Sequence, residues 1–598
     1  MNTAKNPVQI TLKNPALSSL ANMCLGLRPL TAVYDRWIEK TSDSSIPNGE
    51  VGNVGEVFLD HVLGELNTSI QTVHEERLQD IPARGPFIAF ANHPFGGLEG
   101  MQLARLLLRS RPDLKVLTNE ILTLIPEFSD LFVGVDVLSV NSAHKNIAGM
   151  KKVSAHLKQG GALLIFPAGT VASFEPMKGA IIEKPWTNML GRLARKYKAS
   201  CMSIYIEGRN SFGFYLLGLI HKRLRTALLA RELANKNGKC TTMVVGTLLK
   251  QKELKHFTDD NLLTAFLRLN CEALRLKNRV SRPAHAHFEN NPGEKAHRTD
   301  LSDALETLED YLLLSKSPFN VYCVPYQRMG PLVHELARVR ELTFRAAGEG
   351  TGLVEDSDRF DPHYLHLFVW DTDANKLVGS YRMGICDEII ASQGVKGLYS
   401  RSLFKYKQEY IERLGGAVEV GRSFISPEYQ RHPRALDMLW QGIGNFIAKN
   451  PQYHTLFGCV SISSEHSILA RAFLSDTMLT SFAAAPEFLT DIKPVSPLRV
   501  KGKLWTTTML SALSDVAVIN KLVGNFDPGK SVPVLLRHYL ALNGRFVSFS
   551  VNHGFNQALD GLILVDLRHS PLKYLQRYLG HEGSEHFLNK WNVNEAAA

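Results

Sequence analysis

The sequence is poor in cysteine, and none of its cysteines is spaced to bind a metal. Seven of the 598 residues are cysteine, and no two form a C-x-x-C pair. Zinc sites and disulfide frameworks both depend on regular cysteine spacing. We therefore expect no metal site, and reduced thiols as in a cytoplasmic protein. The cysteines are Cys24, Cys201, Cys240, Cys271, Cys323, Cys386 and Cys459.

Long apolar runs are also missing. A transmembrane helix needs about 18 or more apolar residues, whereas the longest candidate here is FGFYLLGLI at 212–220. The first twenty residues, MNTAKNPVQITLKNPALSSL, lack the apolar core of a secretory signal. We therefore expect neither a signal peptide nor a transmembrane helix, and a chain that can lie on a membrane without spanning it.

Signatures of nucleic-acid binding are absent as well. The sequence has no zinc-finger spacing, no RNA-binding aromatic motif and no basic helix with heptads. A net charge of +10 and a pI of about 9.1 nevertheless favour acidic partners. With nucleic acid set aside, anionic lipid and acidic carrier proteins are the partners that the charge predicts.

Length and patterning predict two large domains. A single hydrophobic core stops growing at roughly 250–300 residues, and this chain is about twice as long. From about 70 to 250, short apolar runs alternate with helical patterns, as in an α/β domain. In the second half, HLFVWD and KLVGSYR flank DTDAN, which predicts a hairpin in a mixed sheet. The expected fold class is α/β, with two α/β domains.

The best candidate for a linker is the polar stretch SRPAHAHFENNPGEKAHRTD at 281–300, because it has little to bury. Residues 11–40 mix apolar and basic residues at helical spacing, which suits either packing onto a domain or lying in a bilayer interface. The expected organisation is a helical segment over 1–60, a first domain over 61–280, a linker with a helix over 281–318, and a second domain over 319–598.

The first candidate site is a histidine on a glycine-rich turn. The segment AFANHPFGGLEG places His93 directly after an apolar strand, and Glu99 opens a helical pattern. A neutral imidazole can take the proton of an attacking hydroxyl, and a carboxylate on its other nitrogen fixes the tautomer. His93 and Glu99 fit the roles of base and orienting acid. A strand-end histidine with a solvated glutamate would show the same spacing.

Two later blocks strengthen this interpretation. IFPAGTVAS at 165–173 contains a Pro-Gly turn that can direct backbone N–H groups toward a phosphate, and IYIEGRNSFG at 204–213 adds an arginine and an asparagine. In order and spacing, NHPFGG, FPAGT and IEGRN resemble the blocks of the glycerolipid acyltransferase family over about 70–250. The resemblance implies catalytic His93 and Glu99, and an acceptor site that includes Asn92, Phe166, Pro167, Gly169, Thr170, Arg209 and Asn210.

The chain departs from that family at two points. The family's His-x4-Asp pair is His-x5-Glu here, an extra residue that Gly96 and Gly97 can absorb. The family's FPEGT block reads FPAGT, so the acceptor need not be a glycerol phosphate. Arg209 can contact a carboxylate as readily as a phosphate. Next to this site, FGFYLLGLI and the following HKRLR suit either an anionic bilayer interface or a buried helix flanked by surface charge.

The second half contains another group of motifs, in RVRELTFRAAGEGTG, HLFVWDTDANKLVGSYRMG and EVGRSFISPEYQRHPRALDMLWQGIGNF. Over about 320–580 these resemble the ornithine-acylating, hemolysin-labelled branch of the GNAT superfamily. They also resemble the acyl-homoserine-lactone synthases, which join an acyl chain from acyl carrier protein to an amino-acid amine. The residues that fit that family's pattern are Arg340, Phe344, Asp356, Asp358, Arg382, Glu419 and Arg422.

The residue types agree with an amino-acid acceptor. An ammonium needs a nearby acid and a carboxylate needs an arginine, and Glu419 and Arg422 offer both, beside Arg340. We expect Glu419 to be catalytic, although Arg/Glu clusters also stabilise folds. A deeper acid would favour ornithine, because ornithine has a second ammonium. The candidates for that acid are Glu341, Glu349, Asp356 and Asp358.

The segment QRHPRA at 430–435 bears on the acyl donor. Coenzyme A-dependent GNAT enzymes usually have glycine where Pro433 lies, and proline has no N–H to offer a pyrophosphate. Arg431 and Arg434 could instead meet a single phosphopantetheine phosphate or an acidic carrier surface. We expect acyl carrier protein as the donor, with acyl-CoA as the alternative, no tightly bound cofactor, and direct transfer without an acyl-enzyme.

Together the two resemblances match the bifunctional ornithine lipid synthases. They imply that the C-terminal domain attaches a 3-hydroxyacyl chain to ornithine and that the N-terminal domain acylates the 3-hydroxyl of the resulting lyso-ornithine lipid. A peripheral location on the cytoplasmic face of the bacterial inner membrane follows. The alternatives are the same steps on glycine or another amino acid, a glycerophospholipid acyltransferase with a GNAT-like accessory domain, and a non-enzymatic membrane-binding protein.

Overall fold

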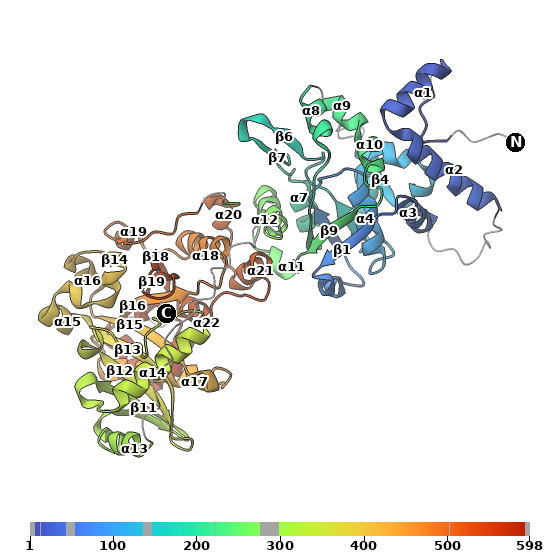
Figure 1. Cartoon of the computed structure of the whole chain (residues 1–598). Coiled ribbons are helices and arrows are strands. Elements are labelled where there is room, and N and C mark those ends of the chain that lie inside the picture. Colours follow the sequence, from blue (N-terminus) through green and yellow to red (C-terminus); the bar gives the residue numbers. More distant parts are fainter. Residues whose placement is uncertain are drawn as a thin grey trace. The chain divides into compact units, whose positions relative to one another are not determined.

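The computed structural model describes residues 6–11, 14–43, 54–135, 146–220, 222–275, 298–500 and 503–592. Contacts divide the chain into two compact units (Figure 1). The first unit is Met1–Asn278 with Gly524–Phe526, and the second is Arg279–Val523 with Asp527–Ala598. Most of the expected linker, residues 281–297, lies outside the described residues.

In its described part, the first unit contains a seven-stranded sheet in the order β1-β9-β8-β2-β5-β3-β4. Neighbouring strands run parallel except β8 and β9. A separate hairpin joins β6 and β7. The strands are β1 Ser69–Val73, β2 Phe87–Ala91, β3 Lys115–Asn119, β4 Phe132–Val135, β5 Ala162–Ile165, β6 Ser173–Glu175, β7 Ala180–Ile182, β8 Ser200–Ile206 and β9 Cys240–Val245.

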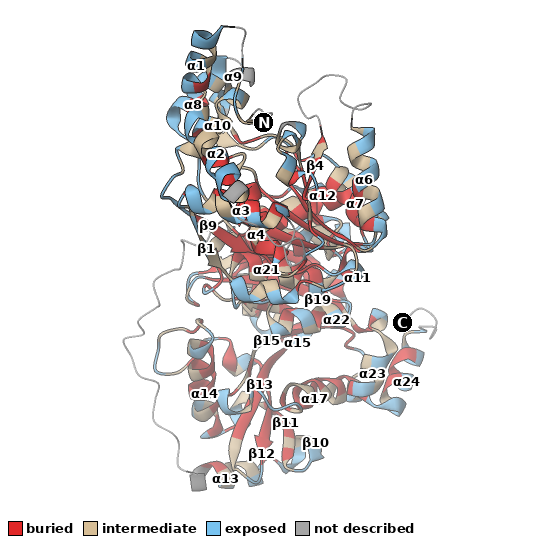
Figure 2. Cartoon of the chain, turned by 90° about the vertical axis from the view of Figure 1, so that its right-hand side faces the viewer, coloured by how far each residue is buried: buried red, intermediate tan, exposed pale blue. Residues whose placement is uncertain are grey.

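Helices surround this sheet, and its central strands are buried on both faces (Figure 2). This explains why β2 and β5 are continuous apolar runs, FIAFA and ALLI, and do not alternate. The helices are α1 Pro15–Cys24, α2 Leu27–Asp43, α3 Val54–Glu65, α4 Leu98–Leu108, α6 Ile147–Lys158, α7 Met189–Lys196, α8 Phe212–Ile220, α9 Lys222–Ala227, α10 Leu229–Ala234, α11 Gln251–Leu254 and α12 Asp260–Glu272.

Residues 11–40 form two helices that differ in how far they pack onto the unit. Helix α2 packs onto the unit, since Tyr34 and Trp37 are buried and both donate hydrogen bonds to Glu127. Helix α1 instead exposes about half of the side-chain surface of Leu17 and Leu20. Among the described residues, no helix combines the length and apolarity that a membrane crossing requires.

The described part of the second unit contains an eight-stranded sheet in the order β10-β11-β12-β13-β15-β16-β19-β18. The expected hairpin around DTDAN is confirmed, because β12 and β13 pair antiparallel on either side of it. A short pair, β14 Phe404–Lys405 with β17 Lys493–Pro494, lies apart. The main strands are β10 Leu312–Lys316, β11 Phe319–Pro325, β12 Leu365–Asp371, β13 Lys376–Ile385, β15 Ala417–Ile425, β16 Thr455–Ile462, β18 Arg545–Asn552 and β19 Ala558–Asp566.

The helices of the second unit cover this mixed sheet, and the α/β class expected from the sequence is confirmed for both units. Helix α14 carries the R-x-x-x-F spacing, and α17 follows the QRHPRA segment. The helices are α13 Arg298–Glu306, α14 Leu332–Ala346, α15 Cys386–Gln393, α16 Gln408–Leu414, α17 Ala435–Lys449, α18 Ile468–Ser481, α19 Pro486–Leu489, α20 Thr507–Leu510, α21 Val516–Phe526, α22 Val534–Ala541, α23 Leu572–Leu579 and α24 His581–Lys590.

Strands β15 and β16 pair for only part of their length. They are parallel neighbours over Ala417–Glu419 and Thr455–Phe457, and then both continue without pairing to each other. They last approach at Gly458, where a Cβ atom would lie 1.9 Å from the carbonyl oxygen of Val420, so only glycine fits. Beyond that point β15 still pairs with β13 and β16 with β19, but not with each other. Strand edges that lack a partner can hydrogen-bond an extended ligand.

Candidate active sites

The three motif blocks of the first unit meet at one edge of its sheet. Strand β2 lies between β5 and β8 and runs parallel to both, with Phe90 beside Ile165 and Ala91 beside Ile204. Because the carboxyl ends of parallel strands lie at the same edge, NHPFGG, FPAGT and EGRN follow side by side. The order inferred from the sequence therefore corresponds to a spatial cluster.

The two predicted asparagines hold these loops together. The Asn92 side chain donates to the Ile206 carbonyl at 2.9 Å and accepts from the Ile206 N–H at 2.6 Å. Asn210 donates through Nδ2 to the Phe95 carbonyl at 3.0 Å. Both side chains are buried and bonded to backbone, so the structure gives them a positioning role. Their expected contact with a substrate stays a prediction.

His93 and Glu99 form the expected pair. His93 Nδ1 lies 3.0 Å from Glu99 Oε1, and the carboxylate also accepts the N–H groups of Phe95 at 2.9 Å and Gly96 at 2.8 Å. Gly96 has φ +120°, so glycine does allow the longer loop between base and acid. Glu99 is fully buried, whereas the His93 side chain is 16% exposed. A substrate can therefore reach the imidazole but not the carboxylate.

The charge on Glu99 is well stabilised despite burial. Burial alone would raise the pKa of Glu99, but its hydrogen bonds from His93 and from backbone N–H groups outweigh burial and lower that pKa. The acid is therefore ionised at neutral pH, as an acid that orients a histidine must be. The position of Glu99 in the first turn of α4 adds the favourable end of the helix dipole.

The FPAGT block surrounds the imidazole on one side. The Phe166 ring lies 4.6 Å from the His93 ring, centroid to centroid, and Gly169 adopts φ +65° in the turn after Pro167. The Thr170 hydroxyl is buried and has no hydrogen-bond partner among the described residues, so it is available to an acceptor. Arg209, from the third block, has an exposed side chain.

Two further residues of this site were not predicted. Glu183 accepts the backbone N–H of His93 and the Trp186 indole N–H at 2.9 Å, and burial raises the pKa of its carboxyl. Lys236 lies 4.4 Å from the Phe95 ring centre and donates to the Arg209 carbonyl at 3.0 Å. Neither residue lies in a motif block, and only the fold brings them to the histidine.

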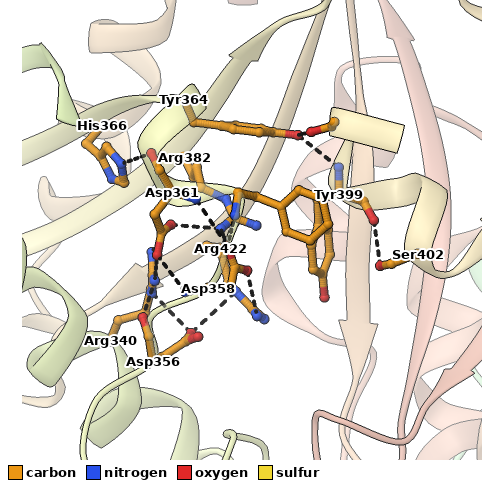
Figure 3. Close-up of polar contacts among 12 residues, drawn as sticks. Arg340, Asp356, Asp358, Asp361, Tyr364, His366, Arg382, Tyr399, Ser402 and Arg422 are labelled. Atoms are coloured by element: carbon orange, nitrogen blue, oxygen red, sulfur yellow. Dashed lines mark hydrogen bonds and ion pairs between the residues drawn. The ribbon is translucent and has the colours of Figure 1, made fainter. Parts of the chain in front are cut away.

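In the second unit, two buried arginines and a third that is nine-tenths buried meet three aspartates (Figure 3). Arg340 of α14 pairs with Asp356 at 3.1 Å and with Asp361 at 2.9 Å. Arg382 of β13 pairs with Asp358 at 2.6 Å and with Asp361 at 2.8 Å. The structure thus joins four of the predicted residues, and it adds Asp361, which the sequence analysis missed.

Arg422 of β15 completes the cluster but is held more loosely. Its guanidinium lies 3.4 Å from both Asp356 and Asp358, and it stacks on Tyr399 and Phe555, with 5.0 and 4.8 Å to the ring centres. These ion pairs are longer than those of Arg382. Arg422 is therefore the arginine of this cluster best able to turn its donors to a ligand.

A β-bulge gives Arg422 its direction. Register shifts between Ser380 and Arg382 of β13, so that two residues of β15 face one of β13, and Arg422 has φ +47°. In a regular strand, residues three apart point to opposite faces. The extra residue reverses that relation, and Glu419 and Arg422 both contact Tyr399.

Glu419 is buried and already has three donors. It accepts the N–H of Tyr399 at 2.9 Å, the N–H of Ser400 at 2.7 Å and the hydroxyl of Tyr364. The carboxylate therefore fixes the turn that carries Tyr399. No contact with Arg422 is recorded, and the expected catalytic contact of Glu419 with an amine stays a prediction.

Four other expected residues lie outside this cluster. Glu341 pairs with Arg345 at 2.7 Å and accepts the N–H groups of Thr351 and Gly352, so it clamps a loop. Phe344 packs edge-on against Phe555 in the core. At the start of α17, Arg431 is exposed, whereas Arg434 donates to the backbone of the β10–β11 turn.

Two more buried acids lie next to Arg422, namely Glu349 and Asp560. The Ser461 hydroxyl donates to Glu349 at 2.9 Å, and Ser461 of β16 lies directly opposite Asp560 of β19. Asn552 donates to Asp560 at 2.8 Å and to the Tyr399 hydroxyl at 3.2 Å. Glu349 was one of the predicted deeper acids, but Asp560 lies in an apolar strand that shows no motif.

Asp361→Asn tests how far the second unit depends on its shared aspartate. Burial alone would raise the pKa of Asp361, but the charges of Arg340 and Arg382 outweigh burial and lower it. Removing that charge leaves two buried arginines partly unpaired, so we expect a loss of about 3–5 kcal/mol of folding stability. Asp373→Asn, in an exposed turn, is the control and should change stability by less than about 0.5 kcal/mol.

The pH dependence of this loss gives a second readout by denaturant titration. A carboxyl with a lowered pKa stabilises the fold above its unfolded pKa and loses that effect as pH falls through its folded pKa. The deficit of Asp361→Asn should therefore be full at neutral pH and shrink in acid. A deficit that is constant from neutral pH into strong acid would contradict the assignment.

Comparison with known proteins identifies a family for each half of the chain. Residues 58–283 match the family described as Acyltransferase, and residues 339–441 match the family described as Acetyltransferase (GNAT) domain. A glycine N(alpha)-acyltransferase of Phocaeicola vulgatus is 28% identical over 265 residues, covering 42% of this chain and 81% of that protein. A lyso-glycine lipid O-acyltransferase of the same organism is 24% identical over 200 residues, covering 32% and 68%.

Among solved structures, the 1-acyl-sn-glycerophosphate acyltransferase of Thermotoga maritima is 17% identical and covers 44% of this chain and 97% of its own, with a TM-score of 0.28. The family matches, together with relatives that are themselves acyltransferases, identify the chemistry. The chain therefore has an acyltransferase domain followed by a GNAT domain, and it is an acyl-transferring enzyme.

Proposed function

We propose that this enzyme makes a diacylated aminolipid in two steps. Its C-terminal domain transfers a 3-hydroxyacyl chain from acyl carrier protein to the α-amine of ornithine, and its N-terminal domain then acylates the 3-hydroxyl. The observation that carries the proposal is that one chain holds both a His93–Glu99 pair and a GNAT unit with a buried arginine beside an open sheet edge.

The relatives support the order of steps. One is a glycine N(alpha)-acyltransferase and another a lyso-glycine lipid O-acyltransferase, so amide and ester formation on an aminolipid occur in separate proteins similar to this chain. Glycine is therefore the main alternative acceptor. Ornithine is favoured by the sequence resemblance in the C-terminal half, and two sites in one chain would raise the local concentration of the intermediate.

Amide formation would take place where β15 and β16 separate. Their unpaired edges can hydrogen-bond the amides of a phosphopantetheine arm, and Arg422 can bind the acceptor carboxylate. The free amine attacks the thioester carbonyl, the C–N bond forms, the C–S bond breaks, and the proton lost by nitrogen ends on the thiol. In this proposal Glu419 acts by holding Tyr399 beneath Arg422.

Ester formation would use the histidine. His93 takes the proton of the 3-hydroxyl, the oxygen attacks a second thioester, and the imidazolium returns the proton to the departing thiolate. Glu99 keeps the imidazole in the right tautomer and stabilises its charged form. The free Thr170 hydroxyl and Arg209 lie on the loops of this site and are the groups we assign to the acceptor.

The lipid acceptor would come from a bilayer that α8 contacts. Phe212 and Ile220 of this helix are 80% and 71% exposed, whereas Phe214 is buried against Val171, next to Thr170. An apolar face beside the acceptor loop suits a membrane interface better than water. Of the expected basic flank, residue 221 and the side chains of 222–224 lie outside the described residues.

His93→Ala tests the second step in a host that lacks aminolipids. Mass spectrometry should show diacyl ornithine lipid with the wild type and mono-acyl lipid with His93→Ala, since the base is lost but the amide is still formed. His256→Ala, an exposed histidine of the same unit, should behave as the wild type. If only phospholipid chains change, the enzyme is a glycerophospholipid acyltransferase and the proposal fails.

Arg422→Ala tests the first step. We expect N-acylation to fall by at least about 100-fold, mainly through a raised KM for the amino acid, because a carboxylate loses its charged donor. O-acylation of added lyso-lipid should not change. Arg413→Ala, which breaks an exposed pair with Asp491, is the control. Full N-acylation by Arg422→Ala would remove this arginine from the site.

The membrane contact is tested by sedimentation with vesicles that contain anionic lipid. Phe212→Ser with Ile220→Ser should weaken binding at least about 30-fold, since about 2 kcal/mol or more of apolar burial is lost. Val534→Ser, 60% exposed in the other unit, should bind as the wild type. Equal binding of all three proteins would exclude α8 as the contact.

A further inference from the structure

The arginine–aspartate cluster of the second unit is electrically balanced by itself. Arg340, Arg382 and Arg422 supply three positive charges, and Asp356, Asp358 and Asp361 supply three negative charges, with each arginine within 3.4 Å of two aspartates. The six charges cancel, so the cluster as a whole supplies no net positive charge to another buried acid.

Glu349 and Asp560 are therefore two buried acids without a cation of their own. Glu349 is 6% exposed and Asp560 is 4% exposed. Among the described residues, no lysine, arginine or histidine lies within ion-pair distance of either carboxylate, and their recorded side-chain partners are neutral: Ser461 for Glu349, and Asn552 for Asp560. Burial raises the pKa of Glu349 to about 8 and that of Asp560 to about 6. Burying such a pair is costly unless a cation joins it.

Arg422, next to these two acids, is short of hydrogen-bond acceptors. Arg422 is 90% buried, yet among the described residues it makes one hydrogen bond, to Asp358 at 3.4 Å, and its Nε makes none. Its charge acts on both Glu349 and Asp560. A buried guanidinium short of acceptors thus lies beside two buried carboxylates short of a cation. A ligand with one anionic and one cationic group could pair with Arg422 and with the two acids at the same time.

The geometry keeps these groups in fixed relation. Tyr399 stacks under Arg422, its hydroxyl accepts from Asn552, and Asn552 also holds Asp560. Glu341 clamps Thr351 and Gly352, two residues beyond Glu349, so the loop that carries this acid is anchored. The cluster lies at β16 and β19, past the point where β15 and β16 separate.

We propose that Glu349 and Asp560 bind the side-chain ammonium of the acceptor while Arg422 binds its carboxylate, so that the C-terminal domain selects a diamino acid over glycine. This inference rests on the proposed function and names its substrate class. Glycine has no side chain to reach the two acids and would leave them unpaired. A site with buried polar groups rejects a substrate that fails to satisfy them.

The test compares acceptors on the purified full-length chain with 3-hydroxyacyl carrier protein as donor. Ornithine, norvaline and glycine are used, because norvaline keeps the chain length of ornithine but lacks the second ammonium. The wild type should prefer ornithine to norvaline by at least about 100-fold in kcat/KM. In Glu349→Gln and Asp560→Asn, the value for ornithine should fall by a similar factor while that for norvaline is unchanged or rises.

Two controls distinguish a loss of acceptor selection from a loss of folding. Glu465→Gln removes a nearby acid that is exposed and paired with Lys530, and it should keep the preference for ornithine. N-acylation of norvaline reports whether the C-terminal domain of each variant is folded, and O-acylation of added lyso-lipid on the same samples reports the N-terminal domain. Ornithine should raise the thermal midpoint of the wild type more than norvaline does, and this difference should disappear in Glu349→Gln.

Three results would overturn the inference. Equal use of ornithine, norvaline and glycine by the wild type would show that no diamino acid is selected, with amide formation itself intact. A loss of activity toward every acceptor in Glu349→Gln or Asp560→Asn would mean that these acids act in the chemistry and not in selection. If the wild type acylates no amine while O-acylation proceeds, the proposed function fails and the inference fails with it.

Discussion

Three largely buried arginines can lie together only where their charges are neutralised, and the C-terminal site is built on that constraint. Asp361 receives both Arg340 and Arg382, which ties α14 to β13. The other two aspartates already pair with Arg340 and Arg382, so Arg422 lies at longer distances from them and stacks on aromatic rings. The unequal sharing of three acids thus creates one arginine that is charged and buried but still available.

In the N-terminal site, backbone N–H groups stabilise the buried charge. Glu99 has no arginine beside it, and its charge is kept by N–H groups at the start of α4 and by His93. The turn whose N–H groups bind the Glu99 carboxylate also orients His93, because Gly96 lets the chain reverse within a few residues. Here the catalytic pair and the helix start are one piece of structure.

Much of this could be predicted where spacing along the chain decides the outcome. The parallel strands that bring NHPFGG, FPAGT and EGRN together were visible as apolar runs, and the pairing of His93 with Glu99 followed from a short loop. Asp361 was missed because it begins a single 3-10 turn, Asp361–His363, in a segment where neighbouring aspartates look alike. Asp560 was missed because 211 residues separate it from Glu349, and only the pairing of β16 with β19 brings the two together. The direction of Arg422 depends on a bulge that alternation of residue types does not reveal.

Gly458 allows β15 and β16 to approach each other closely. Its missing side chain lets β16 pass within contact of Val420, and immediately afterwards the two strands diverge. The absence of a side chain at residue 458 is therefore what allows β15 and β16 to lie side by side up to the point where their pairing ends. A methyl group at this position would clash with the Val420 carbonyl oxygen, so a larger residue at 458 would disturb the pairing of β15 with β16 without touching any charged group.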